Sequence, residues 1–120
     1  MGADCWEDGT LGLERQIDEQ IALRRMWEVW LTLPPRPRDT FFYSFSTSRG
    51  EDLLTLLFEA GVTAPGEVAS VLGLTIEELV TNWKRMPMRN AELAEMWGVP
   101  RQQVNKWRFQ ALRMIEKRLT

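Results

Sequence analysis

Apolar residues recur at helical spacing along most of the chain. Leu13, Ile17 and Ile21 repeat every four residues, and the stretch 26–33 that follows is apolar nearly all round. This pattern predicts a long amphipathic N-terminal helix over about 11–33, enclosed on more than one side in its second half. Further helices are predicted at about 49–60, 65–72, 76–86, 91–97 and 101–119. No sustained alternation of apolar and polar residues occurs, so we expect an all-α fold of five or six helices.

Prolines, glycines and capping residues set the expected helix ends. The prolines at 34, 35 and 37 are expected to end the first helix and impose an extended linker. The patterns Ser48-x-x-Glu51 and Thr75-x-x-Glu78 are typical of capping boxes, which begin helices, and Asn90 is suited to cap another. Gly61, Gly73 and Gly98 are expected to close helices.

Aromatic residues gather in the N-terminal half of the chain. The segment FFYSF, residues 41–45, is expected to be a short strand or an aromatic-rich loop. Its rings either fill the core, which is the commoner role of aromatics, or form an exposed patch. The apolar helix before it is open to the same two interpretations. The candidate residues for contact with a protein partner are Trp27, Trp30, Phe41, Phe42 and Phe45.

An internal repeat with a spacing of 25 residues occupies the C-terminal half. The segment EVASVLGLTIEEL, residues 67–79, aligns without a gap to ELAEMWGVPRQQV, residues 92–104. Each copy predicts a helix, a tight glycine turn and a second helix, which is the layout of a helix-turn-helix unit. The second copy has every residue needed to fix the angle between its helices: Leu93, Ala94, Trp97, Gly98, Val99, Val104 and Trp107.

The net charge of −2 conceals an uneven distribution. Residues 1–83 hold 6 Lys+Arg and 14 Asp+Glu, whereas residues 84–120 hold 9 Lys+Arg and 3 Asp+Glu. A basic C-terminal third on an acidic body indicates that this third faces a polyanion. The alternative is that the two parts attract each other and form only a folded domain.

The second helix of the second copy carries the side chains suited to DNA. It opens with Arg101, Gln102 and Gln103, whereas its counterpart in the first copy opens with the acidic pair Glu77-Glu78, which would repel phosphate. Arg and Lys suit guanine edges and phosphates, and Gln and Asn suit adenine. We therefore predict base contacts from Arg101, Gln102, Asn105 and Lys106, and phosphate contacts from Arg89, Arg113 and Lys117.

Several function classes lose support from the composition. Histidine is absent and Cys5 is the single cysteine, which leaves no imidazole base, no Cys/His zinc site and no internal disulfide. No glycine-rich phosphate loop occurs. The longest nearly apolar stretch, residues 53–58, is too short to span a membrane. We expect a cytoplasmic binding protein that is not an enzyme and uses no cofactor or metal.

The C-terminal stretch AELAEMWGVPRQQVNKWRFQALRMIEKRL, residues 91–119, resembles region 4 of bacterial sigma factors. The matching positions are Leu93, Ala94, Gly98, Val99, Arg101, Val104, Ala111, Leu112 and Arg113, and the last three are the most distinctive. The resemblance implies that the closing helix enters the major groove of a promoter −35 element and that the domain docks on the flap of RNA polymerase. Gln102, Asn105 and Lys106 differ from the usual family residues, so we expect a different target sequence.

The predicted organisation has two parts. Residues 1–37 form an N-terminal helix and proline-rich linker for a partner or dimer contact, and residues 38–120 form a helical domain. That domain contains a degenerate helix-turn-helix at 64–86 and a DNA-binding one at 89–119. We expect a small phage or bacterial transcription regulator that binds double-stranded DNA and contacts RNA polymerase or forms a homodimer. Two alternatives are a DNA-recognition subunit of a packaging terminase or recombinase, and a polymerase-binding adaptor or inhibitor without DNA contact.

Overall fold

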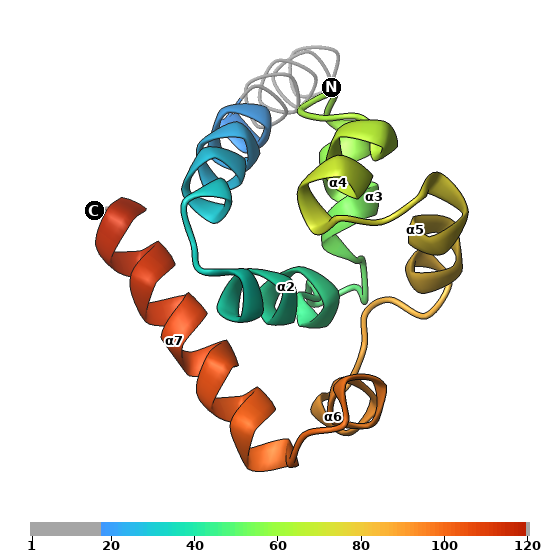
Figure 1. Cartoon of the computed structure of the whole chain (residues 1–120). Coiled ribbons are helices and arrows are strands. Elements are labelled where there is room, and N and C mark those ends of the chain that lie inside the picture. Colours follow the sequence, from blue (N-terminus) through green and yellow to red (C-terminus); the bar gives the residue numbers. More distant parts are fainter. Residues whose placement is uncertain (1–17, 120) are drawn as a thin grey trace, which may run out of the picture.

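The computed structural model describes residues 18–119 of the chain. Within this range the chain folds into seven helices joined by short turns (Figure 1). The N-terminal helix is described over 18–31 and is followed by α2 (Pro35–Ser44), α3 (Leu53–Glu59), α4 (Pro65–Leu72), α5 (Ile76–Trp83), α6 (Asn90–Trp97) and α7 (Arg101–Leu119). The all-α class is confirmed, with one helix more than expected. Residues 11–17 of the predicted first helix lie outside the described residues.

Helix α2 is the main departure from the sequence-based expectations. The extended linker predicted at residue 34 is wrong, because the chain re-enters a helix at Pro35, the first position of α2. Proline fits the first turn of a helix, where its missing N–H group would have no partner in any case. The strand or loop predicted at 41–45 is also wrong, since residues 41–44 are the last turn of α2.

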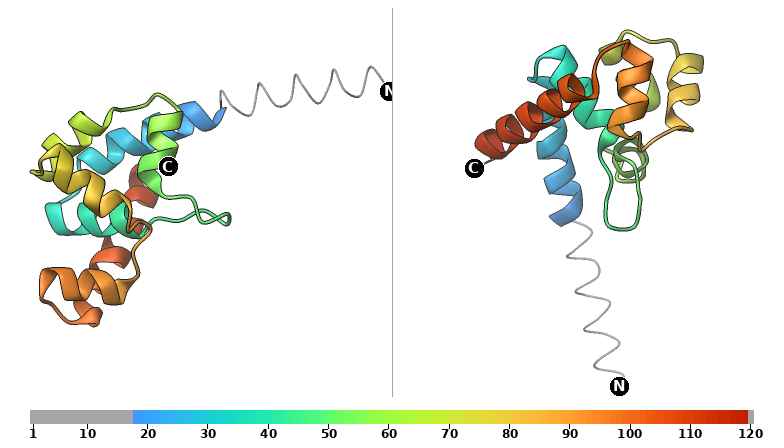
Figure 2. Two further views of the ribbon diagram at one scale, coloured as in Figure 1. Left: turned by 90° about the vertical axis from the view of Figure 1, so that its right-hand side faces the viewer. Right: turned by 90° about the horizontal axis from the view of Figure 1, so that it is seen from below.

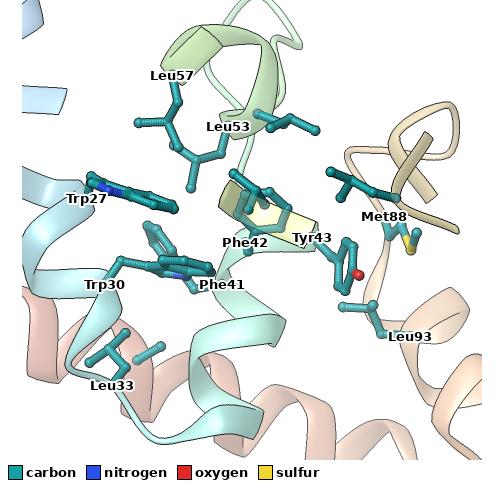
Figure 3. Packing of buried hydrophobic residues seen from close by; sticks show 14 of the residues in the cluster. Trp27, Trp30, Leu33, Phe41, Phe42, Tyr43, Leu53, Leu57, Met88 and Leu93 are labelled. Atoms are coloured by element: carbon teal, nitrogen blue, oxygen red, sulfur yellow. The ribbon is translucent and has the colours of Figure 1, made fainter. Parts of the chain in front are cut away.

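The aromatic residues of this region form the hydrophobic core. The Trp27 and Trp30 rings stack with centroids 4.9 Å apart, and Trp30 meets Phe42 at 5.2 Å. Figure 3 shows these rings facing Leu53 and Leu57 of α3. Trp27, Trp30, Phe41 and Phe42 are all buried, and Phe45 is partly buried. The core interpretation therefore holds for Trp27, Trp30, Phe41 and Phe42, which leave almost no surface to a protein partner.

Helix α3 begins later than the sequence indicates. The expected capping box at Ser48 does not form, because residues 48–49 make a turn held by the isolated β-bridge between Ser46 and Asp52. Asp52 caps the helix instead, with its side chain accepting a hydrogen bond of 2.9 Å from the Thr55 backbone N–H. The predicted helix at 76–86 ends at Trp83, while the bounds of α4 and α7 agree with expectation.

Helix α7 runs along one side of the molecule and closes the fold. It packs on α2 and on α6, and its last turn returns to the N-terminal helix (Figures 1 and 2). Arg118 donates hydrogen bonds to the Thr32 carbonyl oxygen, at 3.2 Å, and to the Thr32 hydroxyl. The predicted boundary at residue 37 falls inside α2. The hydrophobic core continues across it from Trp27 to Ile115, so the boundary does not separate two independent cores. Over residues 18–119, no helix has the length and apolarity needed to cross a membrane.

Candidate nucleic-acid interface

The 25-residue repeat is present in the structure as two matching helix pairs. The pairs are α4–α5 and α6–α7, and both helices of the second pair begin 25 residues after their counterparts. Each pair turns at a glycine in the left-handed conformation, Gly73 with φ 72° and Gly98 with φ 64°. In each turn the next residue donates a backbone hydrogen bond to the alanine five residues earlier, from Leu74 to Ala69 at 2.8 Å and from Val99 to Ala94 at 3.0 Å.

The two pairs also bury the same positions. Val68 and Leu93 are fully buried at equivalent sites in the first helices, as are Leu79 and Val104 in the second helices. The capping box predicted at Thr75 is formed, with the Thr75 hydroxyl accepting from the Glu78 N–H at 3.1 Å. The two pairs therefore share the same glycine turn and the same pattern of burial.

Helix α2 holds the second unit in position. The Arg36 guanidinium lies 4.7 Å from the centre of the Trp97 ring, and Trp97 meets Trp107 edge to face at 6.0 Å. The Tyr43 carbonyl accepts a hydrogen bond of 2.7 Å from the Met88 N–H, just before α6 begins. Burial raises the pKa of the Tyr43 hydroxyl, which accepts a hydrogen bond of 3.1 Å from the Asn82 amide. These contacts tie α2 to the end of α5, to α6 and to the start of α7.

Helix α7 separates its apolar and polar residues as the sequence predicts. Val104, Ala111 and Ile115 are buried against the body. Every residue of this helix that was predicted to contact DNA is exposed: Arg101, Gln102, Asn105, Lys106, Arg113 and Lys117. Burial of the first four would have ruled out groove binding; instead they face outward.

A shallow open depression brings part of this set together. It is lined by the start of α6 and the first two turns of α7, with Arg89, Asn90, Ala91, Arg101, Gln102, Asn105 and Arg108 at its surface. The structure thus joins Arg89, which lies on the other helix of the pair, to three of the four predicted base-contacting residues. Lys106 lies one helical turn after Gln102 on the exposed side, outside this lining. Arg113 and Lys117 lie further along α7 and are not part of the depression.

Sequence reasoning missed Arg108 and Asn90 as members of this site. Arg108 follows Asn105 by three residues, so the two lie on one side of α7, and this spacing was the available signal. The side chain of Asn90 is partly covered, and its Oδ1 atom is buried without a hydrogen-bond partner in the described structure. Asn90 is the first residue of α6 rather than its cap, a position taken by Arg89.

The depression is cationic. Over residues 18–119, no carboxylate oxygen lies within 4.0 Å of the guanidinium of Arg89, Arg101 or Arg108. The start of α7 points into the same region, and the N-terminal end of a helix carries positive partial charge. The nearby carboxylate of Glu92 is engaged elsewhere, accepting from the Arg89 backbone N–H at 3.3 Å and pairing with Arg85 at 4.0 Å. The surface is therefore suited to an anionic ligand with hydrogen-bonding edges.

Comparison of the chain with protein-family models, with curated proteins and with solved structures gives no match. The chemistry of the site accordingly rests on the geometry of α6 and α7.

Proposed function

We propose that this protein binds double-stranded DNA sequence-specifically through α6 and α7, and that it regulates transcription. The observation that carries the proposal is the outward-facing set Arg101, Gln102 and Asn105 on the first two turns of α7, gathered with Arg89 of the α6 start around one depression. In helix-turn-helix proteins the second helix presents its first turns to base edges, while the preceding helix crosses the phosphate backbone.

The dimensions of α7 suit the major groove. Its 19 residues span about 28 Å at the usual helical rise, and a groove about 12 Å wide admits one helix. With the buried stripe of Val104 and Ala111 toward the body, the side with Gln102 and Lys106 is free to enter the groove. We assign base contacts to Arg101, Gln102, Asn105 and Lys106, and phosphate contacts to Arg89, Arg113 and Lys117, with Arg108 added to the latter.

A role in transcription is supported by the resemblance of residues 91–119 to sigma factor region 4. The distinctive Ala111-Leu112-Arg113 run lies beyond the predicted base-contacting residues. A regulator of this kind would contact RNA polymerase while α7 holds the promoter. The flap contact that the resemblance implies belongs to this proposal.

Selection of bound duplexes from a random pool at moderate salt tests binding and specificity together. We expect one enriched motif. On that motif, Arg101→Ala or Lys106→Ala should weaken binding by about 1–3 kcal/mol, as loss of a base contact does. The matched control is Arg49→Ala, an exposed arginine in the turn between α2 and α3, which should leave affinity unchanged.

Two results would oppose the proposal. One is a pool without enrichment, and the other is unchanged affinity of both variants for the selected motif. Recovery of RNA polymerase by a chain that shows no salt-dependent DNA binding would instead favour a protein-binding adaptor.

A further inference from the structure

The first helix pair carries an apolar surface where the second pair carries its polar one. With the 25-residue offset, Ile76, Val80 and Trp83 of α5 stand at the positions of Arg101, Asn105 and Arg108 of α7. Ile76 and Val80 are exposed and Trp83 is partly exposed. Because the two pairs have the same turn geometry, this side of α5 is presented outward as the DNA-facing side of α7 is, but its side chains suit a protein.

The apolar surface extends onto α3. The Phe58 ring is 51% exposed and meets the Trp83 ring edge to face at 6.3 Å. The Trp83 indole is fixed by a hydrogen bond of 3.0 Å from its Nε1 to the Thr55 hydroxyl. We call Phe58, Ile76, Val80 and Trp83 the α5 face. A contiguous, ordered set of large apolar side chains on a small protein marks an interaction surface.

Acidic residues are neighbours of the α5 face along the chain. Glu77 and Glu78 follow Ile76 on α5, and Glu59 follows Phe58 on α3; all three are exposed. Asp52 borders the hollow beside Trp83, where Lys84 is the neighbouring cation. The partner of this face should therefore be apolar at its centre and basic at its edge.

Helix α7 offers a surface of that description beyond its DNA-facing turns. Phe109 is 60% exposed and lines, with Leu112, a mainly apolar groove whose other side includes Phe45, the residue after α2, and the small exposed part of Phe41. Arg113 lines the same groove and Arg108 stands one residue before Phe109, while Glu116 is present toward the far end. We call this surface the α7 groove. The proposed function leaves Phe109 and Leu112 without a role.

We propose that the α5 face of one copy docks into the α7 groove of a second copy, so that the protein assembles head to tail. Apolar side chains meet at the centre, and the acidic edge of one surface meets Arg108 and Arg113 of the other. A two-fold contact of either surface with itself would instead oppose like charges, which disfavours association. Helix α5 and the C-terminal part of α7 lie on opposite sides of the molecule (Figures 1 and 2), so one copy cannot pair its own two surfaces.

This contact leaves Arg101, Gln102 and Lys106 unused, but it shares Arg108 and Arg113 with the phosphate contacts of the proposed function. Phe109 and Leu112 lie beyond the first two turns of α7, where the residues lining the depression end. A head-to-tail contact of this kind can be repeated from copy to copy. It produces a ring if the rotation between successive copies adds up to a full turn, and an open array if it does not.

A mixing experiment with two variants of the full chain tests the arrangement. Val80→Asp disables the α5 face and Phe109→Asp disables the α7 groove; both positions are exposed. In analytical ultracentrifugation at low salt, we expect the wild type to self-associate with rising concentration and each variant alone to stay monomeric. An equimolar mixture should form a one-to-one complex, because each variant retains the surface that the other lacks. The control Ile21→Asp, at an exposed apolar position of the N-terminal helix, should behave as wild type.

A second pair of variants tests the charge complementarity of the two surfaces and leaves their apolar side chains unchanged. Glu77→Lys and Arg113→Glu should each weaken self-association, and their mixture should restore it, since the new lysine then faces the new glutamate. Helical content by circular dichroism identifies any variant that fails to fold. A wild type that stays monomeric throughout, or mixtures that stay monomeric while the wild type associates, would overturn the proposal. The affinity of Val80→Asp for a duplex with one isolated site should equal that of the wild type. This measurement distinguishes a failure of the self-association proposal from a failure of the proposed DNA binding.

Discussion

Two glycines form the turns of the two helix pairs. Gly73 and Gly98 both have positive φ, in the left-handed region that costs other residues about 1–2 kcal/mol. No atom outside the local chain lies within 4 Å of a Cβ built at either position, so an alanine would meet conformational strain but no collision. The two sites thus isolate the effect of turn conformation in each unit.

Replacement of these glycines should separate stability from DNA binding. Gly73→Ala and Gly98→Ala should each lower the free energy of unfolding by about 1 kcal/mol. Only Gly98→Ala should also weaken DNA binding, because its turn orients α7 against α6. Urea denaturation and a fluorescence-anisotropy titration measure the two quantities. Equal effects of both variants on DNA affinity would argue against α7 as the recognition helix.

A partly buried carboxylate on α2 gives a pH-dependent prediction. Burial raises the pKa of Asp39, and the hydrogen bond from Arg38 Nε at 2.9 Å and the charges of Arg38 and Arg36 oppose this only in part. A carboxyl whose pKa is raised by folding lowers stability at neutral pH, and this penalty fades as the pH falls through the raised pKa toward the unfolded value.

Asp39→Asn should therefore raise the melting temperature at pH 7, because the amide oxygen still accepts from Arg38 without a buried negative charge. The advantage should shrink as the pH is lowered through the range in which Asp39 becomes protonated. Thermal unfolding followed by circular dichroism across this range checks both statements. Glu28→Gln, on the exposed side of the N-terminal helix, is the control. A variant less stable than the wild type at pH 7 would contradict the expectation.

Among the elements, α2 shows where local sequence signals fail. Three prolines within four residues indicate a break, and the FFYSF segment favours a strand on propensity alone. Tertiary contacts decide otherwise: Pro35 starts the helix, and Phe41, Phe42 and Tyr43 meet different parts of the core only when helical spacing spreads them around α2. Propensity measured along the chain contains no information about these distant partners.

The core role of α2 predicts a large penalty for truncating one of its rings. Phe42 is fully buried and touches both Trp30 and Tyr43, at centroid distances of 5.2 and 5.6 Å. Phe42→Ala should lower the free energy of unfolding by about 3–5 kcal/mol, the usual cost of such a cavity. Leu31→Ala, at an exposed position, should change it by no more than about 0.5 kcal/mol. Chemical denaturation of both variants gives the comparison.

The C-terminal half was more predictable because its signals are local and repeated. Glycine closures, the Thr75 capping box and the spacing of Val104, Ala111 and Ile115 each act within a few residues, and the structure contains all of them. The candidate site was only partly predictable. The exposed side of α7 followed from periodicity, whereas the grouping of Arg89 with Arg101 and Arg108 depends on how α6 crosses α7, which no local pattern specifies.

For the whole molecule, the charge asymmetry becomes a spatial one. The acidic α5 and the cationic start of α7 occupy separate helix pairs built on the same geometry, so one repeated unit supplies two surfaces of opposite character. Both units rest on the shared core around α2. Long-range attraction to DNA should accordingly act on one end of the molecule and orient it during encounter.

This polarity predicts how salt should affect DNA binding. Each phosphate neutralised by a cation contributes about −0.9 to the slope of log affinity against log salt concentration. Arg89 stands at the α6 start, beside the residues proposed to contact bases but on the other helix. Arg89→Gln should therefore reduce the slope by about one and weaken matched and mismatched duplexes equally. Gln102→Ala should leave the slope unchanged while lowering discrimination between duplexes, because an uncharged side chain releases no counterion.

Affinities measured at several salt concentrations on the selected motif and on a scrambled duplex distinguish these outcomes. If Arg89→Gln altered discrimination but not the slope, Arg89 would be a base contact, and the register of α7 in the groove would have to shift toward α6.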